Sequence, residues 1–342
     1  IIRRIAADKT ACCCKVQIAY YEAMGLKGMS VYAQTLQAEK EAGLFDKYGF
    51  NENKTHNYYY SVSENGGLYV WSNFIMIPRF HIKDTINSKR IFMLRNEKRQ
   101  EAMVEMKQED LVSLQKFMVR VESLGNFIWK ASQRELNKLK SYLYEQTETA
   151  ENISQMGWNR NGFYAFGNGV YYEGEFIKAD DNGIVRLPKG NFYLPSCSVI
   201  YRDETKLFQF ERRFVHLNLS TIRMREYTSQ IFRVFGNNGK IGFMFLIATL
   251  FRDIVTRETR SFPILNLFGP KGSGKSELGH TLMSFFIIKN IPPNMQNSTL
   301  PALNDAVAAV ANGLVHLDEY KNNLDIIKIE FLKGLWDGTG RT

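Results

Sequence analysis

Cysteine is scarce in this sequence, which has 4 cysteines among 342 residues. Three of them, Cys12, Cys13 and Cys14, are consecutive, and adjacent residues on a helix point about 100° apart, so these thiols cannot converge on one metal ion. Cys197 stands alone. The sequence therefore excludes a cysteine-based zinc site and a disulfide framework, and this usage is typical of a reducing cytoplasm.

Long apolar runs are also lacking. The longest, residues 241–251, is about half of the roughly 20 residues that a bilayer crossing demands, and Arg252 and Asp253 close it. The sequence starts at Ile1 without the charged, apolar and small residues that form a secretory signal, and it contains no low-complexity tract or repeat. We expect a globular piece of a larger protein with no membrane span, in which 241–251 forms a buried helix.

Charge is unevenly distributed along the chain. The formal net charge is +9; residues 79–140 hold 14 Lys and Arg against 8 acids, residues 202–260 hold 11 against 6, and residues 262–342 hold 7 of each. An excess outside the last segment is expected if another part of the protein meets a polyanion such as DNA. Ordinary solvated helix surface gives the same pattern, so charge alone leaves both interpretations open.

The length allows two or three domains, and changes in composition along the chain divide it further. We interpret residues 1–55 as a helical connector, 56–150 as an α+β accessory domain with a small antiparallel sheet, 151–215 as a β-rich domain, 216–260 as a helical lead-in and 261–342 as an incomplete catalytic core.

Local signals support these segments. Ser132 and Glu135 form a capping box in front of a periodic leucine stripe, which predicts a helix to about Gln146. The Gly-Asn-Gly at 167–169 lies between two aromatic runs and predicts a β-hairpin, because Asn and Gly tolerate positive φ. Residues 180–183 mark another turn, and the glycines at 236–239 break a helix.

Several aromatic side chains lie in the β-rich segment. Trp158, Phe163, Tyr171 and Tyr172 are of the type that stacks on nucleic-acid bases, but in a sheet such residues are more often core. We therefore favour sheet packing for them over base stacking.

The chemistry of the chain is concentrated near its C-terminal end. A short apolar run at 262–268 predicts a buried strand, and residues 278–288 predict a helix. Between them the sequence matches G-x-x-x-x-G-K-[ST] at every position, which is the signature of a P-loop. The matching residues are Gly269, Pro270, Lys271, Gly272, Ser273, Gly274, Lys275 and Ser276.

The residue types in this loop suit a nucleotide triphosphate. Glycines let the backbone wrap around phosphate oxygens, so that N–H groups and the positive end of the following helix face the anion. Lys275 is expected to reach the β and γ phosphates, and Ser276 to place its hydroxyl on Mg²⁺. ATP and Mg²⁺ are therefore the expected cofactors.

A second motif supplies acids. Residues 314–317 are apolar apart from His316 and lead into Asp318 and Glu319, with Asp318 43 residues after Lys275. This predicts a second buried strand on which Asp318 holds the metal's water shell and Glu319 acts as general base toward the attacking water. Tandem acids favour hydrolysis over phosphoryl transfer to another substrate, which must keep water away. For His316 and for His280 we favour packing over catalysis.

These motifs resemble a known family. Residues 263–276, 313–320 and 328–341 resemble the ATPase part of primase-helicase proteins from phages and other mobile elements, which belong with the superfamily III and AAA+ branch of P-loop proteins. The element at Gly157 and Trp158, the β-rich block after it and the helices before the loop resemble the region that precedes the motor in those proteins. Residues 1–50 weakly resemble the connector after a primase module.

The resemblance implies an α/β P-loop core with a parallel sheet, behind an α+β accessory region. It implies an ATP-hydrolysing DNA helicase that acts on single-stranded or forked DNA, as a homo-oligomeric ring in which a neighbour donates an arginine, with a primase module in the same polypeptide. The alternative interpretation is an AAA+ ATPase that remodels protein, or a nucleotide-dependent switch, with the basic segments as ordinary surface.

The sequence also departs from the family. From Gly269 onward the chain has 74 residues, fewer than the roughly 150 expected for such a domain, so we expect a core truncated at its C-terminal end. The polar sensor, the DNA-contacting hairpin and the trans-acting arginine are expected beyond Thr342. We expect Arg341 to make a surface or DNA contact rather than to act as an arginine finger. A piece of this length is expected to bind nucleotide poorly and to unwind nothing.

Overall fold

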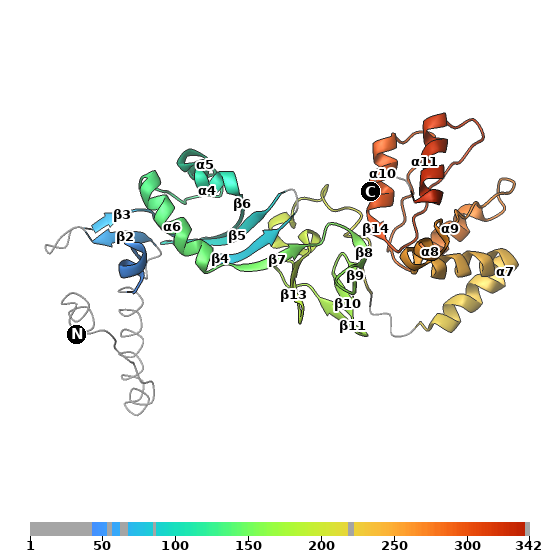
Figure 1. The fold of residues 1–342 in the computed structure, drawn as a ribbon, viewed down its shortest axis with the longest axis horizontal. Coiled ribbons are helices and arrows are strands. Elements are labelled where there is room, and N and C mark those ends of the chain that lie inside the picture. Colours follow the sequence, from blue (N-terminus) through green and yellow to red (C-terminus); the bar gives the residue numbers. More distant parts are fainter. Residues whose placement is uncertain (1–42, 53–56, 62–67, 85–86, 218–221, 339–342) are drawn as a thin grey trace, which may run out of the picture. The chain divides into compact units, whose positions relative to one another are not determined.

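The computed structural model describes residues 43–52, 57–61, 68–84, 87–217 and 222–338 (Figure 1). Most of the expected connector, Cys12 to Cys14 and Arg341 lie outside these residues; within the connector, residues 43–48 are helical. The chain divides into two compact units, Ile1–Glu151 and Asn152–Thr342. Their boundary falls one residue after the end of the expected accessory domain at residue 150.

The first unit is built on antiparallel strands, as predicted for 56–150. The long strands are β4 (Phe74–Lys83), β5 (Lys89–Asn96) and β6 (Glu101–Lys107), with β7 (Glu148–Asn152) parallel to β4. A smaller sheet holds β1 (Asn51–Glu52), β2 (Tyr58–Ser61) and β3 (Leu68–Val70). Both faces of β5 are apolar, since Ile91, Phe92 and Leu94 are fully buried.

Helices cover one face of this sheet. They are α4 (Gln108–Val112), α5 (Leu114–Glu122) and α6 (Gln133–Glu145). The predicted capping box is confirmed, because the Ser132 side chain accepts from the Arg134 amide and Glu135 bonds back to the Ser132 amide. The leucine stripe of α6 packs into a core with Trp71 and Trp129. Burying each leucine contributes about 1.5–3 kcal/mol, which fixes α6 on the sheet.

The second unit begins with short strands. They are β8 (Met156–Asn159), β9 (Phe163–Phe166), β10 (Gly169–Tyr172) and β11 (Glu175–Lys178), antiparallel in that order, with β14 (Val310–Ala311) parallel to β8. The hairpin predicted around residues 167–169 is confirmed. A second hairpin pairs β12 (Ile184–Leu187) with β13 (Gly190–Tyr193), and short 3₁₀ turns follow at Pro195–Cys197 and Val199–Tyr201.

The aromatic side chains of this sheet divide between its two faces. Phe163 and Tyr172 are buried, as predicted, but Trp158 is 44% and Tyr171 43% exposed, so the expectation of core packing is wrong for these two. Trp158 pairs with Tyr164, which in turn pairs with Tyr171, so all three project from one face. Successive residues of a strand alternate between faces, and only one face of these strands is fully buried.

Two helices occupy most of the segment expected as a helical lead-in. Helix α7 (Met224–Thr249) is kinked at Gly236, where φ is 58°, within the predicted break, and α8 (Arg252–Thr259) follows. The prediction that 241–251 is a buried helix is wrong in part: Gly242 and Leu246 are buried, whereas Ile241 and Met244 are exposed. Among the described residues, no helix combines the length and the apolar character that a membrane crossing requires.

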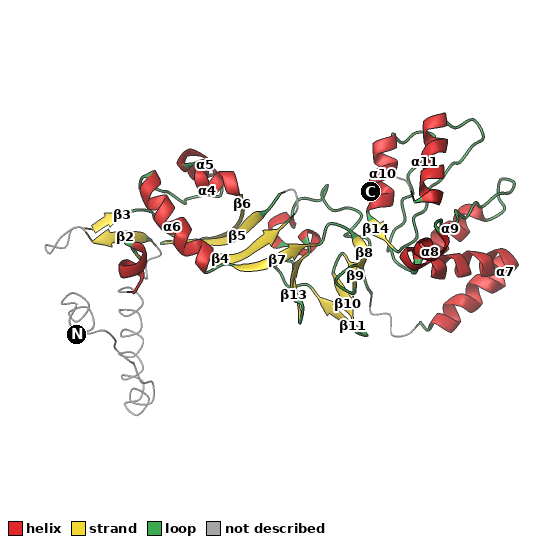
Figure 2. Cartoon of the chain, viewed as in Figure 1, coloured by secondary structure: helices red, strands yellow, loops and turns green. Residues whose placement is uncertain are grey.

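The last part of the chain contains three helices joined by loops (Figure 2). They are α9 (Lys275–Met283), α10 (Leu300–Ala308) and α11 (Ile326–Asp337). Leu278 and Leu282 of α9 belong to the same hydrophobic core as strands β9 and β10 and helix α7. The expected segments 151–215, 216–260 and 261–342 therefore share one core.

Two expected strands are absent from the structure. Residues 262–268 and 314–317 have no strand conformation, and in the described parts of the chain the loop is not attached to a parallel sheet. A parallel strand must be paired along its edges and covered on both faces, but Phe268 is 94% exposed and Ile264 is exposed as well. Residues 262–268, which predicted the first strand, therefore have no neighbouring strand among the described residues. The parallel P-loop core stays a prediction.

Candidate nucleotide-binding site

The predicted loop leads directly into a helix. Gly274 is the N-cap of α9, which starts at Lys275, and the first helical bond runs from the Leu278 amide to the Gly274 carbonyl, 2.9 Å. Lys275 and Ser276 therefore occupy the first turn. The first N–H groups of a helix have no partner within it, and together with the helix dipole they form a site that favours an anion.

Two glycines are required by the backbone of the loop. Gly272 and Gly274 have φ of 82° and 84°, in the left-handed region that side chains disfavour. Neither position is crowded: nothing lies within 4 Å of a Cβ built on Gly272, and the nearest atom to one on Gly274 is Phe235 Cε1, at 3.6 Å. The glycines are therefore needed for the backbone conformation and not to avoid a steric clash.

Lys275 lies folded over its own loop. Its Nζ donates to the Pro270 carbonyl, 2.8 Å away, and lies 3.4 Å from Ser273 Oγ. To reach a phosphate it must exchange the carbonyl for a phosphate oxygen.

The acids lie on a short backbone pairing with the segment before α10. The Asp318 amide donates to the Pro293 carbonyl, 3.0 Å, and the Met295 amide donates to the Asp318 carbonyl, 2.8 Å. This parallel bridge replaces the predicted strand. Asp318 Oδ1 accepts from the Glu319 amide at 2.9 Å, which orients the carboxylate and leaves lone pairs on both oxygens for a metal.

Glu319 stands at the surface with a strained backbone. Its φ is 58°, unusual for a residue with a side chain, and its carboxylate lies 3.9 Å from Lys321 Nζ. A left-handed backbone conformation changes the direction of the side chain relative to those of the adjacent residues. Residues in such conformations are frequent at functional sites.

The acid-bearing segment packs against the helix that follows the loop. A Cβ built on Gly279 would meet His316 Cε1 at 2.7 Å, so the His316 ring lies directly on the backbone of α9, one turn after Ser276. The two predicted motifs are therefore neighbours through His316. Among the described residues, however, no hydrogen bond or ion pair joins Lys275 or Ser276 to Asp318 or Glu319.

His316 and His280 are packing residues, as predicted, and they are also hydrogen-bonded. Asn290 Nδ2 lies 2.8 Å from His316 Nδ1 and 3.2 Å from His280 Nδ1. Burial lowers the pKa of His316, and nearby His280 adds to this while Asp318 acts in the opposite direction. Sequence reasoning missed Asn290, because an asparagine in a loop outside any motif carries no signal of its own.

The donor set suits magnesium in part. Ser276 offers a hydroxyl and Asp318 a carboxylate oxygen, the hard ligands that Mg²⁺ takes alongside phosphate oxygens and water. In the described chain, no group of three or more His, Cys, Asp or Glu residues is placed to hold a metal ion. Mg²⁺ bound with a nucleotide does not need such a cage, because the phosphates supply ligands.

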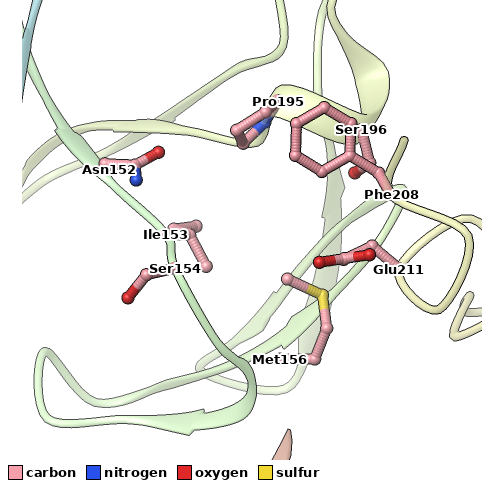
Figure 3. Close-up of a pocket in the computed structure, with 8 residues that line it drawn as sticks. All are labelled: Asn152, Ile153, Ser154, Met156, Pro195, Ser196, Phe208 and Glu211. Carbon is pink, nitrogen blue, oxygen red and sulfur yellow. The ribbon is translucent and has the colours of Figure 1, made fainter. Parts of the chain in front are cut away.

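A separate cavity of about 230 Å³ lies between the start of the β-rich segment and residues 195–211 (Figure 3). In the figure the Glu211 carboxylate and the Phe208 ring border the space opposite Ile153 and Ser154. Its other lining residues are Asn152, Met156, Pro195 and Ser196. None of the residues predicted to bind nucleotide lines it.

Comparison with protein-family models finds no match to this chain, and comparison with curated proteins finds none either.

Proposed function

We propose that this protein binds ATP with Mg²⁺ at the loop around Lys275 and hydrolyses it. One observation carries the proposal: a complete P-loop signature in which two of the glycines adopt left-handed conformations and the lysine and serine open a helix. A chance glycine-rich turn would have no reason to combine all three. Anion binding at such a helix start follows from its free N–H groups and its dipole.

In the proposed reaction the chain's own groups have distinct roles. The loop amides and the Lys275 ammonium bind the β and γ phosphates and stabilise charge that develops there. Ser276 and Asp318 would hold Mg²⁺, which would supply positive charge to neutralise the phosphates. Glu319 accepts a proton from the attacking water. The water oxygen bonds to the γ phosphorus while the bond from that phosphorus to the β–γ bridging oxygen breaks, which releases ADP and phosphate.

We further propose that hydrolysis drives DNA unwinding in the cytoplasm, within a ring of identical subunits. The support is the resemblance to primase-helicases of mobile elements and the basic excess of residues 79–140 and 202–260. One observation favours the alternative, a protein-remodelling ATPase or switch. Several basic residues of 79–140 pair with acids of the same chain: Lys89 forms a largely buried pair, and Arg95 and Lys116 form pairs at the surface.

Phosphate release by the complete protein tests the proposed hydrolysis. We expect turnover with Mg²⁺ that stops when the metal is chelated and falls at least a hundredfold in Lys275→Ala. Lys289→Ala is the matched control, because Lys289 is an exposed lysine beyond α9 and outside the motif. Equal turnover in the Lys275 variant and the parent would contradict the assignment.

A further inference from the structure

Three polar side chains form a bridge between α9 and the acid-bearing segment. His280 lies on α9, His316 two residues before Asp318, and Asn290 in the loop between them. Asn290 Nδ2 is within hydrogen-bond distance of both rings, at 2.8 and 3.2 Å, and the ring centroids are 5.3 Å apart at 75°. We name this set the His–Asn–His bridge.

The chemistry of the bridge fixes its geometry. An amide NH₂ has two hydrogens and no lone pair to offer, so a bridge in which it donates to both rings requires each Nδ1 to accept and each neutral ring to carry its hydrogen on Nε2. One amide thereby uses both of its donors, and the two rings are held at fixed orientations. Gly279 completes the arrangement, since any side chain there would displace His316.

The loop that carries Asn290 also pairs with the acids. After Asn290 the chain reaches Pro293, whose carbonyl accepts from the Asp318 amide, and Met295, whose amide donates to the Asp318 carbonyl. From α11, Lys328 Nζ donates to the carbonyls of Met295 and Gln296, at 2.7 and 3.0 Å. Residues 290–295 therefore run alongside 316–318, and Asn290 is the member of this loop that also reaches α9.

We propose that Asn290 is a positioning residue for ATP hydrolysis: it sets the placement of Asp318 and Glu319 relative to the helix that carries Lys275 and Ser276. This inference rests on the proposed function. Among the described residues, Asn290 has no hydrogen bond to the loop side chains or to the two acids, and it acts through His316, two residues before Asp318. A shift of about 1 Å between reacting groups costs up to a hundredfold in rate, so the bridge matters for turnover more than for nucleotide binding, which the loop performs alone.

Steady-state kinetics of Asn290→Ala in the complete protein test the proposal. We expect kcat to fall tenfold to a hundredfold while KM for ATP changes by less than about threefold. Asn297→Ala is the matched control, the same substitution at an exposed position in the same connection, and should match the parent. A variant with parental kcat, or one in which KM alone rises, would overturn the inference.

A double-variant cycle separates positioning from general damage. If Asn290 acts through His316, the pair Asn290→Ala and His316→Gln should be no slower than His316→Gln alone. Multiplying losses would mean independent effects and would overturn the proposed route. Imidazole ¹⁵N shifts supply a readout independent of turnover: both rings should be Nε2–H tautomers, and an Nδ1–H tautomer at either would refute the bridge.

These outcomes are distinguishable from failure of the proposed function. A parent that does not hydrolyse ATP removes the function and this inference together. An active parent that loses activity in Lys275→Ala but not in Asn290→Ala retains the function and removes only the inference.

Discussion

Lys275, the lysine of the proposed nucleotide loop, is held by a backbone group of that loop. Its ammonium is hydrogen-bonded to the Pro270 carbonyl and faces the loop rather than solvent alone. A hydrogen bond to a charged group contributes about 1.5–3 kcal/mol, so nucleotide binding replaces one such bond with another. The gain comes from the phosphate charge, which a neutral carbonyl does not match.

Glu319→Gln tests the base at the residue scale. Glutamine has the same side-chain length as Glu319 and leaves the left-handed backbone unchanged, but its amide cannot accept a proton from water. We expect ATP binding within about threefold of the parent and turnover reduced by a factor of about 10² or more. Fluorescent-nucleotide titration and phosphate release measure the two; normal phosphate release would refute the role of Glu319 as base.

Gly274→Ala tests the conformation of the loop. At φ 84° the added Cβ is strained by about 1–2 kcal/mol, and the space around it is adequate, so the effect is on backbone path and not on packing. We expect weaker ATP binding by about tenfold in a titration. Gly174→Ala, at φ 91° with nothing within 4 Å, carries matched strain in a β-turn. If it weakened ATP binding equally, the effect would not be specific to the loop.

At the scale of elements, α6 is the clearest case of a sequence signal that the fold obeys. Ser132 caps the helix and the Glu135 side chain accepts from the Ser132 amide, while the leucines on one face of α6 are buried. We expect Ser132→Ala to lower the free energy of unfolding of the first unit by about 1 kcal/mol in urea titrations. Ser141→Ala, in the middle of the same helix, is the control and should change it by no more than about 0.5 kcal/mol.

The same cap has a pH dependence. Burial on its own raises the pKa of Glu135, but hydrogen bonds from the Ser132 side chain and from backbone amides outweigh it, so the folded pKa is lowered. A lowered pKa contributes stability above the unfolded value of about 4.3, and this is lost as pH falls through the folded value. Glu135→Gln should remove this contribution to the acid-induced decrease in the free energy of unfolding, measured by urea titrations at a series of pH values. An unchanged pH profile would contradict the account of the cap.

Elements with local signals were predictable from the sequence, and those that need distant partners were not. The hairpin around Asn168, the cap at Ser132 and the kink at Gly236 each depend on a few adjacent residues. The run at 262–268 has the composition of a buried strand, yet strand formation depends on pairing partners that the run itself cannot specify. The helix after the loop was predictable from the motif, but its end was not: the prediction extends to residue 288, whereas α9 ends at Met283. Asn290 was not predictable, because its role arises only from contact with two histidines elsewhere in the sequence.

At the scale of the whole molecule, two features bear on the choice of partner. The basic excess lies in 79–140 and 202–260, which are outside the sequence segment that carries the proposed nucleotide loop. In the first of these, the pair of Lys89 with Glu105 is largely buried, with side chains 16% and 14% exposed, so this lysine is committed to the fold. Affinity for a polyanion must therefore come from the basic residues that remain at the surface.

A salt series tests the proposed DNA partner. If the ATPase acts on DNA, single-stranded or forked DNA should raise the rate of phosphate release in the complete protein. The stimulation should fade as salt increases, because neutralised phosphates release counterions. An ATPase that is indifferent to DNA at every salt concentration would favour the protein-remodelling alternative.

Calorimetric titration of Mg²⁺ and ATP into the complete protein tests the central claim most directly. We predict saturable binding, one nucleotide per chain, that is lost in Lys275→Ala and retained in Lys289→Ala. Binding of equal affinity in the Lys275 variant, or no binding by the parent, would contradict the claim that this loop is a nucleotide site.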